Sequence, residues 1–382
     1  MNPDVDIAVV GAGASGLAAA VSAARTGAQT LLLDARPAPG GTGGFSGLTT
    51  LCGLYDEDGK FLNDGFVREF AEALAETNEA APARASSTRD LATPHPGVSQ
   101  RQGRVWVLPY RPTRFRELAS QLTTNTPNLR AEWNRSVTEV VCAGNRITQL
   151  NGVRVGAVID CSGVAAVAQA VGAETLATDA RTQAAAIIFP LKKVRRVFSS
   201  VADMAQVLLP LARARFPALH LQPGFAPGEF TAKFAGSAEQ VPALLAFLRA
   251  NVPGFEPCET VPAEITVTAR AGRMIIGAYV LTGADVLGGR KFADAAARGA
   301  WPIEQWPEGQ AARFRYLPPH THYEIPRRCL RAARFENLFM AGKCLSADAD
   351  AIASARVMGL GLATGAAAGV LAVDSLTSTR FK

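Results

Sequence analysis

The stretch Asp6-Ile7-Ala8-Val9-Val10-Gly11-Ala12-Gly13-Ala14-Ser15-Gly16 joins a short apolar run to a glycine-rich turn. The run is rich in β-branched residues, which is typical of a buried parallel strand. Residues 17–25 are rich in alanine and are followed by Gly27, so they predict a helix with a glycine stop. A second apolar run, residues 30–33, ends at Asp34. The order is therefore strand, glycine turn, helix and strand.

Each feature of this unit suits a dinucleotide. Gly11 permits a tight turn, Gly13 lets the backbone approach a pyrophosphate, and Gly16 lets the helix pack closely on the strand. The N-terminus of the helix offers unpaired N–H groups and the positive end of its dipole to the phosphates. Asp34 lies about 20 residues farther on, where it can accept hydrogen bonds from ribose hydroxyls and would repel a 2′-phosphate. The sequence predicts a Rossmann-type nucleotide site rather than a chance glycine-rich turn.

The segment after Asp34 favours FAD over NAD. Residues 34–42, Asp-Ala-Arg-Pro-Ala-Pro-Gly-Gly-Thr, resemble the second conserved stretch of the glutathione-reductase-like FAD superfamily. In that superfamily a Gly-Gly pair lets the chain pass beside the diphosphate arm of the flavin. The alternative is a loop rich in turn-forming residues. An NAD-only dehydrogenase would continue into another βα unit, and this chain does not.

Two later stretches carry the same resemblance. Residues 156–163 form an apolar strand that ends in small residues and glycine, with Cys161-Ser162 in place of the usual Ala-Thr. Residues 337–346 predict a buried strand and a glycine turn, and residues 353–369 predict the final helix. The N–H groups of such a helix point at the pyrimidine edge of the flavin, where negative charge builds on reduction. Alternatively, its glycines serve only close helix packing.

The resemblance implies a noncovalently bound FAD and a set of residues that hold it. These are Gly11, Ala12, Gly13, Ala14, Ser15, Gly16, Asp34, Ala35, Arg36, Gly40, Gly41, Thr42, Ser46, Val137, Cys161, Ser162, Gly163, Gly342, Met358, Gly359, Gly361 and Leu362. Covalent attachment through Cys52 or Cys344 is the alternative, although a small apolar role suits both cysteines better.

The chain resembles the bacterial FAD-dependent oxidoreductase family over nearly its whole length. The most distinctive part is residues 270–287, with an Arg-x-x-Arg pair followed by Gly-x-Tyr and Asp. The resemblance implies a helix over Phe292–Gly299 and a return to the cofactor domain at residues 322–330. Residues 172–264 match poorly, and the loop at residues 41–47 departs from the Gly-Gly-Thr-Ala-Thr of many relatives. Substrate specificity is expected in the poorly matched region.

The implied fold is α/β, with a Rossmann-type, glutathione-reductase-like FAD-binding domain and an inserted α+β substrate or cap domain. We expect a discontinuous FAD domain at 1–90, 113–171 and 331–382, and a cap domain at 91–112 and 172–330. Within the cap, residues 201–216 and 235–252 predict helices. Residues 104–108, 185–191 and 264–268 predict strands, as do residues 129–133 and 136–141 in the FAD domain. Residues 79–97 predict a mobile loop.

Composition places the chain among ordinary globular proteins. It has 382 residues, 48% of them hydrophobic, and a net charge of +6 from Arg scattered along the chain rather than gathered in a block. This pattern disfavours nucleic acid as a partner and favours an anionic small molecule. No basic leader precedes the first strand, and the apolar residues 357–372 suit a tightly packed helix better than a membrane span. The six cysteines show no CxxC spacing, so we expect free thiols in a cytoplasmic protein and no metal.

Candidates for catalysis are few. Arg270 and Arg273 could hold a substrate carboxylate with two hydrogen bonds, although Arg273 could instead be a structural ion-pair residue between the lobes. His320 and His322 could act as general acid or base, although solvated loop histidines are commoner. Tyr279 suits a core strand. No third ligand completes a metal site with the two histidines.

Three functions stay open at this point. The first is an FAD-dependent oxidoreductase that transfers hydride between a small organic substrate and FAD, with or without a separate electron acceptor. The second is an NAD(P)H-dependent flavin monooxygenase, although no second GxGxxG is present. The third is a catalytically silent flavin-binding protein. A homodimer fits any of the three, and the sequence carries no interface signature.

Overall fold

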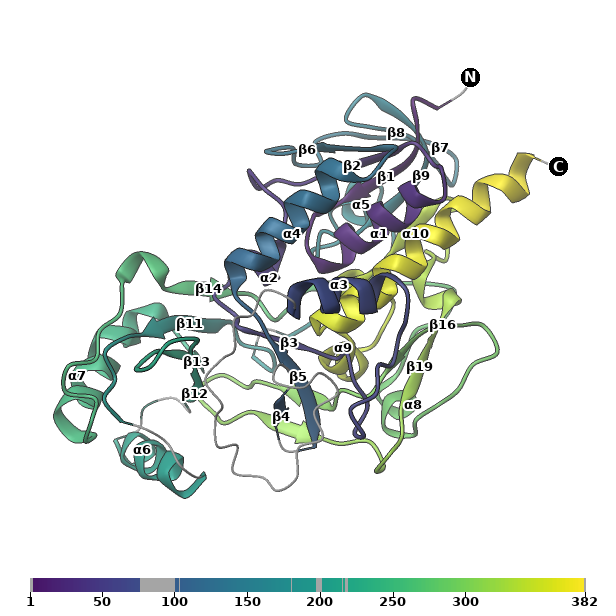
Figure 1. Ribbon diagram of the computed structural model, residues 1–382. Helices are drawn as coiled ribbons and strands as arrows, with labels where there is room; N and C mark the ends of the chain where they lie inside the picture. The colour runs from purple at the N-terminus through teal and green to yellow at the C-terminus, as the bar shows by residue number, and fades with distance from the viewer. Residues whose placement is uncertain are drawn as a thin grey trace.

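The computed structural model describes residues 3–75, 100–102, 104–179, 181–196, 201–214, 216 and 219–380. One part, the nucleotide lobe, lies near both termini in Figure 1. A second part, the cap lobe, carries α6 (Val201–Arg213) and α7 (Val241–Asn251) at the opposite end of the molecule. The predicted loop at residues 79–97 and the predicted boundary at residues 90 and 91 lie outside the described residues.

A mainly parallel sheet forms the nucleotide lobe. Its strand order is β6-β2-β1-β9-β8-β7, and β20 also pairs with β9. The pairs β1–β2, β1–β9, β2–β6 and β9–β20 are parallel, whereas β8 is antiparallel to both β9 and β7. The bounds are β1 Val5–Val10, β2 Thr30–Leu33, β6 Leu129–Glu132, β7 Val140–Ala143, β8 Arg146–Leu150, β9 Val153–Asp160 and β20 Leu338–Met340. The predicted strand at residues 136–141 therefore begins later, at Val140.

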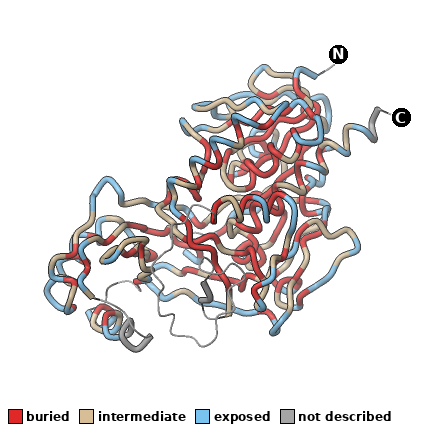
Figure 2. Tube along the Cα trace, in the orientation of Figure 1, coloured by how far each residue is buried: buried red, intermediate tan, exposed pale blue. Residues whose placement is uncertain are grey.

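Both faces of this sheet are buried, as Figure 2 shows for the interior of the lobe. Ile7 and Val9 of β1 face one core cluster, and Ala8 and Val10 face another. The first cluster holds the apolar residues of α1 (Ala14–Arg25) and α10 (Met358–Arg380). This double burial explains why β1 reads as a continuous apolar run rather than an alternating one.

The last helix, α10, packs backbone to backbone on α1. A Cβ atom on Gly365 would lie 2.0 Å from the carbonyl oxygen of Ser15, and one on Gly369 would lie 2.4 Å from that of Ala19. Among the described residues only Met358–Thr377 is long and apolar enough to cross a membrane, and 56% of that stretch is buried inside the protein. Its glycines serve helix packing, as the sequence predicted.

The cap lobe is built on a four-stranded antiparallel sheet of order β12-β13-β11-β14. Its strands are β11 Ala186–Leu191, β12 His220–Pro223, β13 Phe230–Ala235 and β14 Thr266–Thr268. Helices α6 and α7 cover one face, where Phe189, Phe234 and Leu248 share a core. The predicted helix over residues 235–252 is shorter than expected, because Ala235 ends β13 and Ser237 caps a 3-10 turn before α7.

The remaining helices and strands complete the fold. The helices are α2 Gly41–Phe45, α3 Phe66–Ala75, α4 Pro112–Asn125, α5 Ala166–Ala170, α8 Gly283–Leu287 and α9 Ala349–Ala355. The strands are β3 Thr50–Cys52, β4 Gln100–Gln102, β5 Val105–Pro109, β10 Thr175–Ala177, β15 Arg273–Ile275, β16 Ala295–Gly299, β17 Ile303–Gln305, β18 Arg313–Arg315 and β19 Tyr323–Pro326. Strand β5, predicted as part of the cap, pairs with β3 of the predicted FAD domain.

The helix expected over Phe292–Gly299 is wrong. Ala295–Gly299 forms β16, which pairs antiparallel with Tyr323–Pro326. A Cβ atom on Gly299 would lie 2.6 Å from the ring of Tyr323, so this glycine admits the close approach of the two strands. Tertiary pairing overrides the helix propensity of the alanines here.

Candidate functional site

A cavity of about 780 Å³ extends from the nucleotide lobe to the cap lobe. One side begins where parallel strands end, because Gly11, Asp34 and Cys161 follow β1, β2 and β9. Ligands of open α/β sheets bind at this edge of the strands. The other side is the sheet of the cap lobe. We call these the nucleotide end and the cap end of the cavity.

Glycines shape the nucleotide end. Gly11 has a φ of +97°, and a Cβ atom there would lie 2.6 Å from the carbonyl oxygen of Cys161. A Cβ atom on Gly41 would lie 2.6 Å from the Cα atom of Gly13, so the two loops touch backbone to backbone. Among the residues that the structure describes, no side chain caps the N-terminus of α1, and Ala14 and Ser15 of its first turn line the cavity. The amides there are free to receive a diphosphate.

Asp34 links the two strands on which the nucleotide end is built. Its Oδ2 accepts a hydrogen bond from the backbone N–H of Ala12 at 2.5 Å, and its Oδ1 accepts one from that of Arg36 at 2.8 Å. Each carboxylate oxygen keeps acceptor capacity beyond these bonds. Asp34 lines the cavity, so its carboxylate fits a ribose diol.

Most of the predicted cofactor-binding residues meet along this cavity. The lining includes Gly11, Gly13, Ala14, Ser15, Asp34, Ala35, Arg36, Gly41, Thr42, Val137, Cys161, Ser162, Gly163, Gly342, Met358 and Gly361. These residues come from segments that are far apart in the sequence, between Gly11 and Gly361. The fold therefore brings the predicted FAD-binding stretches together in one place. This assembly, with its glycine cradle and capless helix, fits an FAD molecule.

The other predicted residues are outside the described lining, where they support the loops. They are Ala12, Gly16, Gly40, Ser46, Gly359 and Leu362. A Cβ atom on Gly16 would lie 1.6 Å from the carbonyl oxygen of Gly11, and one on Gly359 would lie 2.6 Å from the carbonyl carbon of Gly53. Ser46 donates its hydroxyl to the carbonyl of Thr42, and Leu362 is fully buried.

The cap end owes its polar face to strand alternation. In β13, Thr231 and Lys233 line the cavity, whereas Phe230, Ala232 and Phe234 lie in the core under the helices. Strand β11 repeats the pattern with Ala186 and Ile188 on the cavity side. Side chains alternate between the two faces of a strand, so one short sequence builds both the core and the wall of the site.

A buried carboxylate organises the cap end. Glu304 of β17 accepts hydrogen bonds from the indole N–H of Trp301 at 2.9 Å and from that of Trp306 at 2.7 Å. Burial alone raises the pKa of the Glu304 carboxyl, but Arg356, Lys233 and the two indole donors together lower it below its usual value. Glu304 is therefore ionised at neutral pH.

Cations surround this carboxylate. The Cζ atom of Arg270 lies 4.0 Å from the centre of the Trp306 ring, and the Nζ atom of Lys233 lies 4.9 Å from it. Burial and, after it, nearby Arg356 lower the pKa of Arg270 to about 9, while Glu304 opposes the shift. Burial likewise lowers the pKa of Lys233. Such shifts accompany crowded positive charge, which is commonest at functional sites.

Histidine 220 adds a titratable ring to the cap end. It lines the cavity, and its ring centre lies 4.7 Å from that of Trp306. The surrounding protein and then Lys233 lower the pKa of His220 to about 4, although part of the side chain stays accessible. At neutral pH the imidazole is uncharged and can accept a proton.

The two cysteines considered for covalent attachment are both protonated thiols at neutral pH. Burial, followed by the nearby Glu304, raises the pKa of Cys52 to about 12, and Cys52 lines the cavity. Burial and Asp160 raise the pKa of Cys344 well above its usual value, and its Sγ accepts a hydrogen bond from the N–H of Gly163. Neither provides a thiolate nucleophile. All six cysteines are free, and no three His, Cys, Asp or Glu side chains in the described chain could hold a metal.

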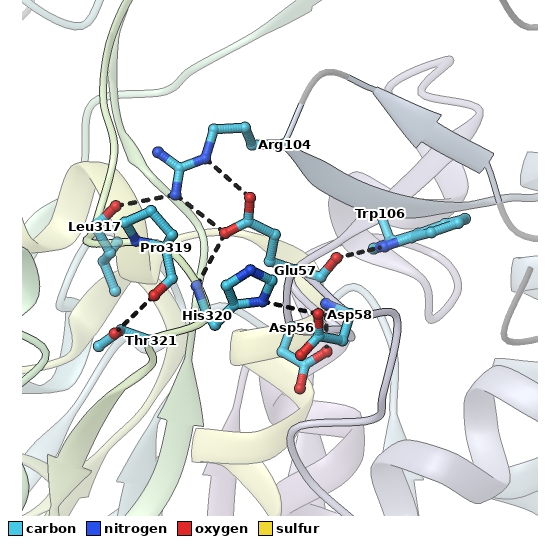
Figure 3. Close-up of polar contacts among 9 residues, drawn as sticks. All are labelled: Asp56, Glu57, Asp58, Arg104, Trp106, Leu317, Pro319, His320 and Thr321. Atoms are coloured by element: carbon cyan, nitrogen blue, oxygen red, sulfur yellow. Dashed lines mark hydrogen bonds and ion pairs between the residues drawn. The ribbon is translucent and has the colours of Figure 1, made fainter. Parts of the chain in front are cut away.

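None of the three predicted catalytic residues is in the described lining of the cavity. Arg273 donates to the hydroxyl of Thr175 at 3.0 Å. His320 is exposed, with Nδ1 at 2.8 Å from Asp58 and its backbone N–H donating to Glu57, as Figure 3 shows. The backbone carbonyl of His322 accepts a hydrogen bond from Lys291. The structure places all three outside the cavity, in contacts that stabilise loops and strands.

Sequence reasoning missed most of the cap end. Of the residues there, Arg270 was considered as a holder of a substrate carboxylate, whereas His220, Lys233, Glu304 and Arg356 were not considered. Two signals were available in the sequence. One is a single Lys in residues 230–235, where apolar and polar residues alternate, and the other is a Glu between two Trp in residues 301–306. Neither signal is specific, because these residues meet only through tertiary folding.

The chain belongs to the FAD-dependent oxidoreductase family. The profile of the family described as FAD dependent oxidoreductase matches residues 6–207 and 218–380. The cofactor of this enzyme is therefore FAD, and its chemistry is redox. The resemblance inferred from the three FAD-binding stretches is confirmed at this level. A comparison with curated proteins gives no match.

Solved structures share the fold at low sequence identity. A geranylgeranyl bacteriochlorophyll reductase-like protein from Thermoplasma acidophilum is 13% identical, with a TM-score of 0.55 over 99% of this chain and 80% of that chain. GidA from Aquifex aeolicus is 14% identical, with a TM-score of 0.52 over 98% of this chain and 64% of that chain. The flavin-dependent brominase Bmp2, as a triple mutant, is 12% identical, with a TM-score of 0.50 over 98% of this chain and 81% of that chain. These identities show a common architecture only.

Proposed function

We propose that this FAD-dependent oxidoreductase transfers hydride between a small organic substrate and a noncovalently bound FAD. The observation that carries the proposal is the continuity of the cavity. The glycine cradle at Gly11 and Gly13 opens into the same space as the charged, tryptophan-lined cap end. A dinucleotide extended from the cradle toward the cap would bring its reactive ring next to the second group of residues.

The residues of the chain would divide the work along the cavity. The amides of Ala14 and Ser15 and the carboxylate of Asp34 would hold the diphosphate and ribose. The N-terminus of α10, at Met358, would stabilise negative charge on the ring. The cap sheet would exclude water and orient the substrate. Bound FAD would supply the redox chemistry, and the protein supplies binding, orientation and electrostatics.

The finer assignment to the glutathione-reductase-like superfamily is part of this proposal. It is supported by the parallel strands β6, β2, β1, β9 and β20, and by Asp34 at the end of β2. A cytoplasmic location is also proposed, because the six free thiols suit a reducing compartment. We further propose that the partner is a small molecule rather than nucleic acid or a membrane. A homodimer is compatible with this proposal.

The proposal is tested by the absorption spectrum of the purified protein before and after acid precipitation. Flavin bands that move to the supernatant would support noncovalent FAD, and anaerobic bleaching by candidate donors would follow. Bands that stay with the pellet would contradict the noncovalent site. A colourless protein that takes up no added FAD would overturn the proposal.

A further inference from the structure

The cap end contains positive charge that the protein does not pair. Lys233, Arg270 and Arg356 line it, and Glu304 is the one carboxylate among its described lining residues. Each oxygen of Glu304 accepts a hydrogen bond from an indole N–H group, and its single negative charge faces three cations. The other acidic residue in the described lining, Asp34, lies at the nucleotide end. The cap end therefore carries a net charge of about +2 when all four groups are ionised.

Individual donors in this group lack acceptors. Arg270 is 7% exposed, its Nη1 donates to the carbonyl of Ala184 at 2.8 Å, and its buried Nη2 has no partner in the described structure. The ammonium of Lys233 makes no hydrogen bond or ion pair with any described residue; it lies against the ring of Trp306, within electrostatic reach of Glu304. A desolvated donor without an acceptor is unfavourable. An incoming anion would remove that cost.

Aromatic surface surrounds these donors. The guanidinium of Arg270 and the ammonium of Lys233 both lie against Trp306, whose indole orientation is fixed by Glu304. Trp301, Phe314 and Tyr316 also line the cavity. A ligand that combines an oxyanion with a planar apolar group would satisfy the cations and the rings together.

We propose that Lys233 and Arg270, held against Trp306, form a carboxylate-binding subsite, and that the substrate is a carboxylic acid with a planar, apolar body. The inference rests on the proposed function, since it assigns a substrate class to the same cavity. Lys233 lies within residues 172–264, the region in which substrate specificity was expected. The alternative role for these cations is to stabilise the negative charge of the reduced flavin.

The test is a titration of the FAD-bound enzyme with benzoate, followed through the flavin absorption spectrum, beside an identical titration with benzamide. Benzoate should bind at least tenfold more tightly than its neutral analogue. The variant Lys233→Met keeps an apolar stem and should reduce benzoate affinity at least tenfold while leaving benzamide unchanged. Lys192→Gln is the matched control, because Lys192 follows strand β11 of the same sheet and already pairs with Glu264. It should bind benzoate as the wild type does.

The outcomes separate the two proposals. A protein without flavin fails the proposed function and is recognised before any titration. With flavin bound, equal binding of benzoate and benzamide to the wild type overturns the carboxylate subsite, whether or not Lys233→Met folds. If Lys233→Met lowers the flavin reduction potential but leaves benzoate affinity intact, the cations serve the flavin and the inference is wrong. Arg270→Lys keeps the positive charge but loses the planar guanidinium that can donate two parallel hydrogen bonds to a carboxylate. It should weaken benzoate binding by a smaller factor than Lys233→Met does.

Discussion

The two ends of the cavity are made from different parts of the chain and by different means. At the nucleotide end, backbone atoms of glycines such as Gly11 and Gly13 form much of the surface, beside a side chain of fixed role, that of Asp34. At the cap end, charged and aromatic side chains from distant segments, including Lys233, Glu304 and Arg356, form the surface. The first end suits a constant cofactor, and the second suits a particular substrate. Predictions should therefore differ sharply between them.

The largest effect is expected from Gly16→Ala. The new Cβ atom would lie 1.6 Å from the carbonyl oxygen of Gly11, so the helix must move away from the strand. We expect a loss of at least about 3 kcal/mol in unfolding free energy and little retained FAD. Gly27→Ala is the control, because Gly27 has a φ of +94° and no neighbour within 4 Å, so it should cost only about 1–2 kcal/mol of backbone strain. Thermal unfolding and flavin absorbance measure both, and equal losses would contradict the packing argument.

A smaller but still large effect is expected from Glu304→Gln at the cap end. The amide can accept from one indole but presents an N–H₂ group to the other, and the cations lose their carboxylate. We expect a loss of about 3 kcal/mol, as for a buried ion pair that loses one partner. Glu308→Gln, exposed and nearby, should stay within about 0.5 kcal/mol of the wild type. Chemical denaturation of both variants checks this, and a stable Glu304→Gln would disprove the organising role of Glu304.

Acid should destabilise the protein in part through His220. The folded pKa is lowered to about 4, so between that value and the ordinary histidine pKa the unfolded chain binds the extra proton. Stability therefore falls as the pH drops from about 6.5 toward 4. The lowered pKa of Glu304 adds to this fall only near and below the ordinary glutamate pKa, where the unfolded chain takes up the proton first.

The measurement for this effect is the melting temperature at pH 7 and pH 5 for the wild type and His220→Gln. The melting temperature of His220→Gln should fall less between pH 7 and pH 5 than that of the wild type. Burial also lowers the pKa of His322, so part of the slope should persist. An unchanged slope in His220→Gln would show that the ring titrates as it does in the unfolded chain.

The smallest effect is expected at His320, outside the cavity. Its pair with Asp58 is exposed, so His320→Gln should change the unfolding free energy by about 0.5 kcal/mol or less. FAD retention and benzoate affinity should match the wild type. A large loss of either would return His320 to the functional site and break the contrast between the two regions.

The sequence allowed prediction of the nucleotide end because its determinants are local. A tight turn, a close backbone approach and an acid at the end of the next strand each leave a mark within residues 6–42. The cap end left little mark beyond Arg270, since Lys233, Arg270 and Glu304 lie far apart in the sequence and meet only in the tertiary fold. The helix expected over residues 292–299 failed for the same reason, because a strand partner at Tyr323–Pro326 overrode local propensity. A site made by residues close together in the sequence can be predicted from the sequence. A site made by residues far apart in the sequence is seen only in the fold.

The central claim is that one cavity holds FAD along the glycine cradle with its reactive ring toward the cap sheet. The most direct measurement is a crystal structure of the FAD-bound enzyme. The account predicts the diphosphate within hydrogen-bond distance of the amides of Ala14 and Ser15, the ribose at Asp34, and the ring between the start of α10 and the face of β13 that carries Lys233. A diphosphate bound elsewhere, or a ring turned away from Lys233, would contradict it.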